Sequence, residues 1–113
     1  MVIWITGLSG AGKTTLAKEI VNQLTTENIE PILLDGDQLR EIFVDSSNQV
    51  ISSHDRSSRL TLALKYSGLT RLLSEQGFWV IVATISLFKE VHDWNRKNLK
   101  NYYEVFLDTP IEE

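Results

Sequence analysis

Residues 5–17 read ITGLSGAGKTTLA, and this stretch decides the fold class. Four of its residues match the pattern G-x-x-x-x-G-K-[ST] without deviation: Gly7, Gly12, Lys13 and Thr14. The apolar run VIWIT at 2–6 precedes the pattern, and apolar residues with helical spacing follow it. A strand, a glycine-rich loop and a helix in this order predict a phosphate-binding loop, or P-loop.

Each part of the predicted loop has a physical role. Glycines let backbone N–H groups turn toward phosphate oxygens, and the helix N-terminus adds a favourable dipole. Lys13 would place its charge on the β- and γ-phosphates of ATP, and the Thr14 hydroxyl would coordinate Mg²⁺. The residues expected to bind the nucleotide are Gly7, Leu8, Ser9, Gly10, Ala11, Gly12, Lys13, Thr14 and Thr15. A glycine turn that carries a lysine by chance is the alternative, and hydrolysis, transfer and sensing stay open.

Strand and helix patterns alternate along the rest of the chain. The apolar runs that predict strands are 2–6, 31–35, 78–84 and 102–108. Helical patterns follow at about 13–27, 37–43, 55–77 and 87–101. The sequence contains no repeat or low-complexity segment. We therefore expect a single α/β domain over 1–113, a three-layer α/β/α sandwich with a parallel sheet and right-handed crossovers.

Composition limits the classes of function. A chain of 113 residues with a formal charge of −4 suits one globular domain and argues against general nucleic-acid binding. No apolar run approaches the ~20 residues of a membrane span, and no signal peptide pattern is present. The absence of cysteine excludes disulfides and thiolate metal sites and suits a reducing compartment. These features predict a cytoplasmic protein with a small-molecule partner, and neither nucleic acid nor membrane.

Two carboxylates follow the second predicted strand, in the segment LLDGDQLR. Residues two apart in an extended turn point the same way, so Asp35 and Asp37 are both expected to face the γ-phosphate. Asp35 would support the metal, and Asp37 would orient or deprotonate an acceptor hydroxyl. With Lys13 they form the predicted catalytic set, and Thr14 and Asp35 the predicted metal ligands. The alternative is that Asp37 only caps the next helix.

Arginines and apolar side chains near the predicted strand ends suit an acceptor. The guanidinium groups of Arg40 and Arg56 fit an anionic acceptor, although a surface salt bridge is the alternative for each. Ile85, Phe88 and Phe43 could enclose a base, with a place in the core as the alternative. The two histidines, His54 and His92, lack metal-ligand spacing and are expected at the surface.

The ordered set of motifs resembles the adenylylsulfate (APS) kinase family over nearly the whole chain. The matching segments are WITGLSGAGKTTLA, LLDGDQLRE, DRSSRL, VIVATISLFKE and YYEVFLDTPIEE. This family transfers the γ-phosphoryl of ATP to the ribose 3′-hydroxyl of adenylylsulfate in sulfate assimilation, with Mg²⁺, on a P-loop kinase fold. By position, the resemblance implies substrate-binding roles for Asp37, Arg40, Phe43, Arg56, Ile85 and Ser86.

Three departures from the family pattern concern the acceptor side and the end of the chain. Arg59 stands where the family has an acceptor-binding Asn, and the paired arginines that follow in the family are absent. Leu87 replaces a proline, which changes the backbone at the expected acceptor pocket. The family continues beyond TPIEE into an Arg- and Lys-containing lid, so we expect a truncated chain. The sheet edge that a truncated chain exposes could form a homodimer contact.

The departures leave alternative functions. Chains with an ATISLFKE and NRKN pattern resemble kinases of bacterial surface-polysaccharide pathways, including one that acts on cytidine diphosphoramidate. A nucleotide-dependent switch is a second alternative, but the guanine-reading Asn-Lys-x-Asp segment is absent. A nucleotide-binding module without catalytic activity is the third.

Overall fold

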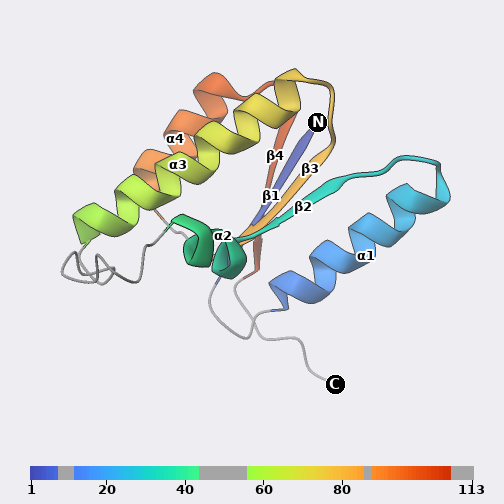
Figure 1. Cartoon of the computed structure of the whole chain (residues 1–113), viewed down its shortest axis with the longest axis horizontal. Coiled ribbons are helices and arrows are strands. Elements are labelled where there is room, and N and C mark those ends of the chain that lie inside the picture. Colours follow the sequence, from blue (N-terminus) through green and yellow to red (C-terminus); the bar gives the residue numbers. More distant parts are fainter. Residues whose placement is uncertain (8–11, 44–55, 86–87, 108–113) are drawn as a thin grey trace.

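A computed structural model of the chain describes residues 1–7, 12–43, 56–85 and 88–107 (Figure 1). Strands and helices alternate along these residues. They are β1 (Val2–Gly7), α1 (Lys13–Thr26), β2 (Ile32–Asp35), α2 (Gly36–Phe43), α3 (Arg56–Glu75), β3 (Val80–Thr84), α4 (Lys89–Asn98) and β4 (Tyr102–Leu107). The strands form one parallel four-stranded sheet in the order β2-β3-β1-β4.

Helices cover both faces of this sheet. Figure 1 shows α1 on one side of the sheet and the helices α3 and α4 on the other. Neighbouring strand residues point to opposite faces, so Trp4 and Val82 pack toward α3 and α4, whereas Ile5 and Ile81 pack toward α1. The continuous apolar runs of β1 and β3 are buried for this reason. The predicted three-layer α/β/α sandwich is confirmed.

The carboxyl ends of the strands meet along one edge of the sheet. Thr6 of β1 lies beside Thr84 of β3, and Asp35 of β2 lies beside Ala83. The chain leaves β1 toward β2 and leaves β3 toward β4, so the direction of the connections reverses between β1 and β3. Ligands of open α/β sheets bind at such a point.

Several element boundaries differ from the sequence expectation. β3 begins at Val80 and not at Phe78. Phe78 is exposed and lies outside the strand. α4 ends at Asn98, before the expected boundary. α2 begins at Gly36, directly after β2 and without an intervening turn. Across the described ranges, no helix has both the length and the apolar content required to cross a membrane.

Gly7 marks the place where β1 runs into the predicted phosphate loop. A side chain at this position would clash with the backbone carbonyl oxygen of Leu107 on β4. Gly7 also has a positive φ of 154°. The close approach of β1 and β4 therefore requires glycine at the first position of the motif.

Candidate active site

The N-terminus of α1 forms the described part of the phosphate loop. Gly12 precedes the helix with φ 89° and ψ 20°, a left-handed conformation that favours glycine. The first intrahelical bond runs from the Leu16 N–H to the Gly12 carbonyl at 3.0 Å. The N–H groups of Thr14 and Thr15 therefore have no acceptor within the helix, and both residues are exposed. This end of α1 has the donors and the dipole that an oxyanion requires.

Several residues of the sequence prediction lie outside the described residues. They are Leu8, Ser9, Gly10 and Ala11 of the loop, His54 and Asp55 before α3, and Ser86 and Leu87 after β3. Their expected contacts with nucleotide and acceptor stay predictions.

Asp35 caps helix α2. Its Oδ1 accepts hydrogen bonds from the backbone N–H groups of Asp37 at 2.8 Å and Gln38 at 3.3 Å. The alternative that Asp37 caps this helix is therefore wrong, because the capping residue is Asp35. The argument from an extended turn is also wrong, since Asp37 lies in the first turn of α2. Asp35 is partly buried, whereas Asp37 is exposed.

Gly36 brings the start of α2 against the end of β3. A Cβ at Gly36 would lie 3.0 Å from Thr84 Oγ1 and 3.2 Å from the Ala83 carbonyl oxygen. Both distances are tighter than ordinary contacts, so a larger residue would push α2 away from the sheet. The glycine between the two carboxylates thus places Asp37 at the same sheet edge as the phosphate loop.

Tyr66 of α3 contacts both ends of α2, and the sequence patterns did not predict this contact. Its hydroxyl donates to the Gly36 carbonyl at 3.4 Å, and its ring lies 5.9 Å from the Phe43 ring. Burial raises the pKa of Tyr66 to about 12, and the charges of Arg40 and Asp37 act on it in opposite directions. Helical spacing from Ala63 could have indicated that Tyr66 is buried, but not that it contacts α2.

Arg56 forms an ion pair with Glu90 across the starts of α3 and α4. Its Nη2 lies 3.0 Å from Glu90 Oε2 and 3.2 Å from Oε1. The guanidinium also stacks on the Phe88 ring at 5.1 Å, and the Arg59 guanidinium lies over the same ring at 6.0 Å. The surface salt bridge considered for Arg56 is therefore present.

The three apolar residues expected around a base have different surroundings. Phe43 packs on Tyr66 and stays partly exposed, while Phe88 contacts the core as well as the arginines. Ile85 follows β3 and is 50% exposed. Ile85 is thus the most exposed of the three, and no described contact joins the three side chains into one stack.

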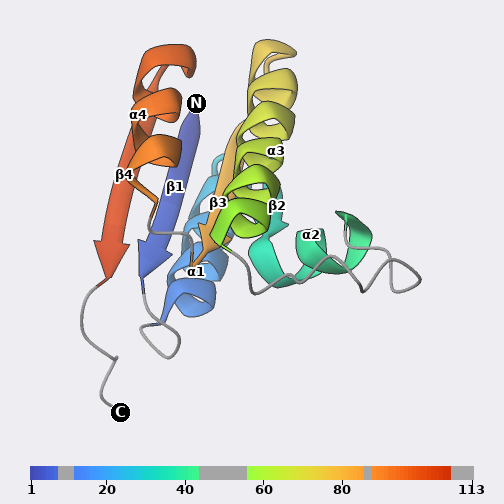
Figure 2. The same cartoon turned by 90° about the vertical axis from the view of Figure 1, so that its left-hand side faces the viewer.

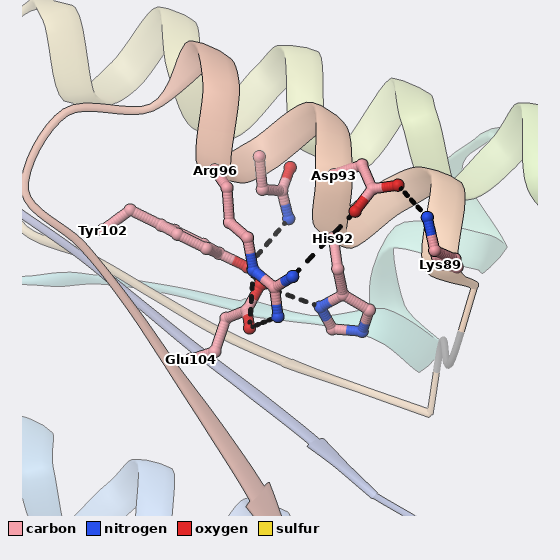
Figure 3. Close-up of polar contacts among 7 residues, drawn as sticks. Lys89, His92, Asp93, Arg96, Tyr102 and Glu104 are labelled. Atoms are coloured by element: carbon pink, nitrogen blue, oxygen red, sulfur yellow. Dashed lines mark hydrogen bonds and ion pairs between the residues drawn. The ribbon is translucent and has the colours of Figure 1, made fainter.

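A polar cluster joins α4 to β4, and Figure 3 shows it. Its members are His92, Asn95, Arg96, Tyr102 and Glu104. Glu104 accepts from Arg96 Nη2 at 2.6 Å and from the Tyr102 hydroxyl at 2.9 Å, and His92 Nδ1 lies 3.1 Å from Oε1. The expectation that His92 is a surface residue is wrong, because only 16% of its side chain is exposed.

The cluster holds Glu104 in its ionised form. Burial alone would raise its pKa, but hydrogen bonds from Arg96, Tyr102 and His92 outweigh that effect and keep the pKa below its ordinary value. The carboxylate therefore ties helix α4 to the edge strand at neutral pH. The members come from segments up to 12 residues apart, and no sequence pattern indicated their meeting.

Oxygen ligands for a divalent cation are present on two elements of the site. The described residues include no group of three or more His, Cys, Asp or Glu side chains arranged to hold a metal ion. Thr14 lies at the start of α1, and Asp35 uses Oδ1 for the cap. A hydroxyl and one carboxylate oxygen fit Mg²⁺ when phosphate oxygens and water complete the shell.

Comparison with known proteins identifies kinases as the relatives of this chain. The family model described as adenylylsulphate kinase matches residues 1–113. The cytidine diphosphoramidate kinase of Campylobacter jejuni is 43% identical, over 99% of this chain and 62% of that protein. The adenylyl-sulfate kinase of Pseudomonas aeruginosa strain PAO1 is 39% identical, over 99% of this chain and 56% of that protein.

Solved structures agree with the sequence relatives. The APS kinase of Mycobacterium tuberculosis in complex with AMPPNP and APS matches with a TM-score of 0.78 and 30% identity. The match covers 97% of this chain and 63% of that one. The chain thus spans between 56% and 63% of the lengths of these relatives.

Proposed function

Since this chain belongs to the adenylylsulphate kinase family, we propose that the protein transfers the γ-phosphoryl of ATP to the ribose 3′-hydroxyl of adenylylsulfate. The observation that carries the proposal is that α1 and α2 both start at the carboxyl ends of the parallel strands. One helix starts with the phosphate-loop motif, and the other starts with the Asp35-Gly36-Asp37 segment. A donor site and an acceptor site side by side are what phosphoryl transfer requires.

The donor side would be formed by the phosphate loop. The exposed N–H groups at the start of α1 would bind phosphate oxygens, and Lys13 would place its charge on the β- and γ-phosphates. The remaining loop residues, Leu8, Ser9, Gly10 and Ala11, are assigned to the nucleotide by the motif alone. Thr14 and Asp35 would hold Mg²⁺, which neutralises charge on the phosphates when it is bound.

Asp37 is the residue proposed to act on the acceptor hydroxyl. In the transfer step, the hydroxyl oxygen bonds to the γ-phosphorus, the bond from this phosphorus to the β–γ bridging oxygen breaks, and ADP leaves. The hydroxyl proton passes to the Asp37 carboxylate. The exposed position of Asp37 in the first turn of α2 supports this role, because its carboxylate is not used as the helix cap.

The acceptor would be bound by residues that follow the strand ends. Arg40 and Arg56 are proposed to bind its anionic groups, and Phe43, Ile85 and Ser86 to surround its base. The exposed apolar surface of Ile85 supports this assignment. The acceptor is a small molecule, and we expect the reaction in the cytoplasm, where ATP and Mg²⁺ are available.

A second candidate is transfer to cytidine diphosphoramidate or another nucleotide-linked acceptor. The 43% identity to the Campylobacter jejuni kinase of that name favours it, and so do the departures at Arg59 and Leu87 on the acceptor side. Both candidates share the donor side, so only the acceptor distinguishes them.

The test is an assay of ADP release by the full-length protein with adenylylsulfate and with cytidine diphosphoramidate as separate acceptors. Adenylylsulfate turnover with formation of the 3′-phosphorylated product would support the first candidate. Turnover with the cytidine compound alone would replace the acceptor and keep the reaction class. ATP binding without turnover of either acceptor would contradict both candidates and indicate a binding module.

A further inference from the structure

The ion pair between Arg56 and Glu90 joins the first turns of two helices that are far apart in the sequence. Arg56 is the first residue of α3, and Glu90 is the second residue of α4. Figure 2 shows that both helices begin at the end of the sheet to which the strands point. The pair therefore lies at the edge that carries the phosphate loop, on the side where the acceptor is proposed to bind.

Stability alone is a weak explanation for this pair. The Arg56 and Glu90 side chains are 65% and 46% exposed, and exposed ion pairs contribute little to folding. Orientation is a better one, because the guanidinium is constrained in two ways. Glu90 contacts only Nη2, through both carboxylate oxygens, and the Phe88 ring covers one face.

These constraints leave part of the guanidinium for a ligand. Among the described residues, no acceptor contacts Nε or Nη1 of Arg56. The N–H groups of these two nitrogens point in different directions, and each can donate to an oxygen of a phosphate or sulfate group. An arginine already held at Nη2 and at one face loses little side-chain freedom when its remaining N–H groups bind an anion.

Glu90 has the rigid support that a positioning residue requires. The polar cluster of His92, Asn95, Arg96, Tyr102 and Glu104 ties α4 to β4 within one or two turns of Glu90. A hydrogen bond from its own backbone N–H and one from Arg56 keep the pKa of Glu90 below its ordinary value. Glu90 is therefore ionised when the site operates at neutral pH.

We propose that Glu90 is a positioning residue that acts through Arg56 and holds the Nε and Nη1 N–H groups of its guanidinium toward the anionic group of the acceptor. The inference rests on the proposed function, because it assumes that Arg56 binds the acceptor. Glu90 stays paired during binding, so its removal weakens acceptor binding and leaves ATP binding unchanged.

The experiment measures acceptor binding by calorimetry, with AMPPNP present, in the full-length protein. Adenylylsulfate and cytidine diphosphate serve as the probes. In Glu90→Ala, we expect the Kd of the acceptor that binds the unmodified protein to rise about 3- to 10-fold, as expected for coupled neighbours. Glu90→Gln keeps an oxygen for Nη2 but loses the charge. The acceptor Kd of this variant should therefore lie between that of the unmodified protein and that of Glu90→Ala. The Kd of AMPPNP should stay unchanged in both variants.

A double-mutant cycle separates positioning from a general structural effect. In an Arg56→Ala background, the further change Glu90→Ala should leave the acceptor Kd unchanged, because Glu90 no longer has the residue through which it acts. The matched control is Glu75→Ala, which removes the exposed Arg71–Glu75 pair at the other end of α3 and should not change the Kd.

The outcomes distinguish this inference from the proposed function. An acceptor Kd in Glu90→Ala equal to that of Glu75→Ala would overturn the inference alone. A loss of affinity that persists in the Arg56→Ala background would also overturn it, since Glu90 would then act by another route. Failure of the unmodified protein to bind either probe would contradict the proposed function, and the inference would fall with it.

Discussion

The Asp37 backbone N–H donates a 2.8 Å hydrogen bond to Asp35 Oδ1. This contact starts helix α2 between the two carboxylates and gives them different environments. Asp35 is tied to the backbone of the helix that it caps, whereas Asp37 projects from the first turn and is exposed. Two carboxylates that the sequence pattern treats as a pair are therefore expected to respond differently to mutation.

Neutralising Asp37 should remove catalysis and leave the fold intact. In Asp37→Asn we expect turnover to fall about 10²- to 10⁴-fold, as for loss of a general base. Its side chain caps nothing, so the free energy of unfolding should change by less than about 0.5 kcal/mol. Turnover by coupled ADP release and unfolding by urea would measure both.

Asp35 should separate capping from charge. Asp35→Asn keeps an oxygen that can accept the two N–H groups, whereas Asp35→Ala loses it and should cost about 0.5–2 kcal/mol of stability. Both variants lose the charge proposed to support Mg²⁺, so both should need more Mg²⁺ for half-maximal turnover. Equal stability of the Asn and Ala variants would contradict the capping role.

Gly36 and Gly68 provide a matched pair of glycine variants. In Gly36→Ala, the new methyl group meets Thr84 and Ala83, so we expect a loss of about 1–3 kcal/mol of stability and lower turnover as α2 shifts. At Gly68, inside α3, nothing lies within 4 Å, and Gly68→Ala should stabilise the protein by about 0.5–1 kcal/mol. Thermal unfolding of the two variants would show opposite shifts in Tm.

Arg59 is expected to affect the choice of acceptor. Its guanidinium lies over Phe88 beside that of Arg56, at the position where the family pattern has Asn. Arg59→Asn should raise kcat/KM for adenylylsulfate relative to cytidine diphosphoramidate by about tenfold, a difference typical of one altered polar contact. A ratio unchanged from that of the unmodified protein would exclude Arg59 from acceptor selection.

Glu104 should make a pH-dependent contribution to stability. Its pKa is lower in the folded protein than its ordinary value of 4.5, so the contribution is present above that value and is lost as the pH falls through the folded pKa. Glu104→Gln should therefore cost about 1–3 kcal/mol at pH 7, and the difference from the unmodified protein should shrink as the pH falls below 4.5 and through the folded pKa. Urea unfolding at several pH values measures it.

A matched variant checks that the Glu104 effect comes from the polar cluster. Glu75→Gln removes an exposed carboxylate that pairs with Arg71 on the same helix. We expect a change of at most about 0.5 kcal/mol at neutral pH. A loss as large as that of Glu104→Gln would mean that any glutamate variant destabilises the protein.

The fold was predictable because its signals are local. Continuous apolar runs predicted β1 and β3, and the glycine motif predicted the loop between β1 and α1. The same kind of signal placed Asp35 and Asp37 at a strand end. Periodicity of two and of 3.6 residues is determined by neighbours in the chain, so a sequence carries it directly.

The contacts around the candidate site were not predictable because they join distant segments. Tyr66 reaches Gly36, Arg56 reaches Glu90, and His92 reaches Glu104. Each pair depends on how two elements pack on the sheet, and no local pattern contains that information. The cap by Asp35 was missed for a different reason: Asp35 and Asp37 are both good capping residues, and only the start of the helix distinguishes them.

The most direct test of phosphoryl transfer is ADP release by the full-length protein with ATP, Mg²⁺ and adenylylsulfate. The proposed function predicts release at a rate far above that without acceptor, with one 3′-phosphorylated product formed per ADP, and the loss of this activity in Lys13→Ala. Release that does not depend on adenylylsulfate, or ATP binding without any release, would contradict it.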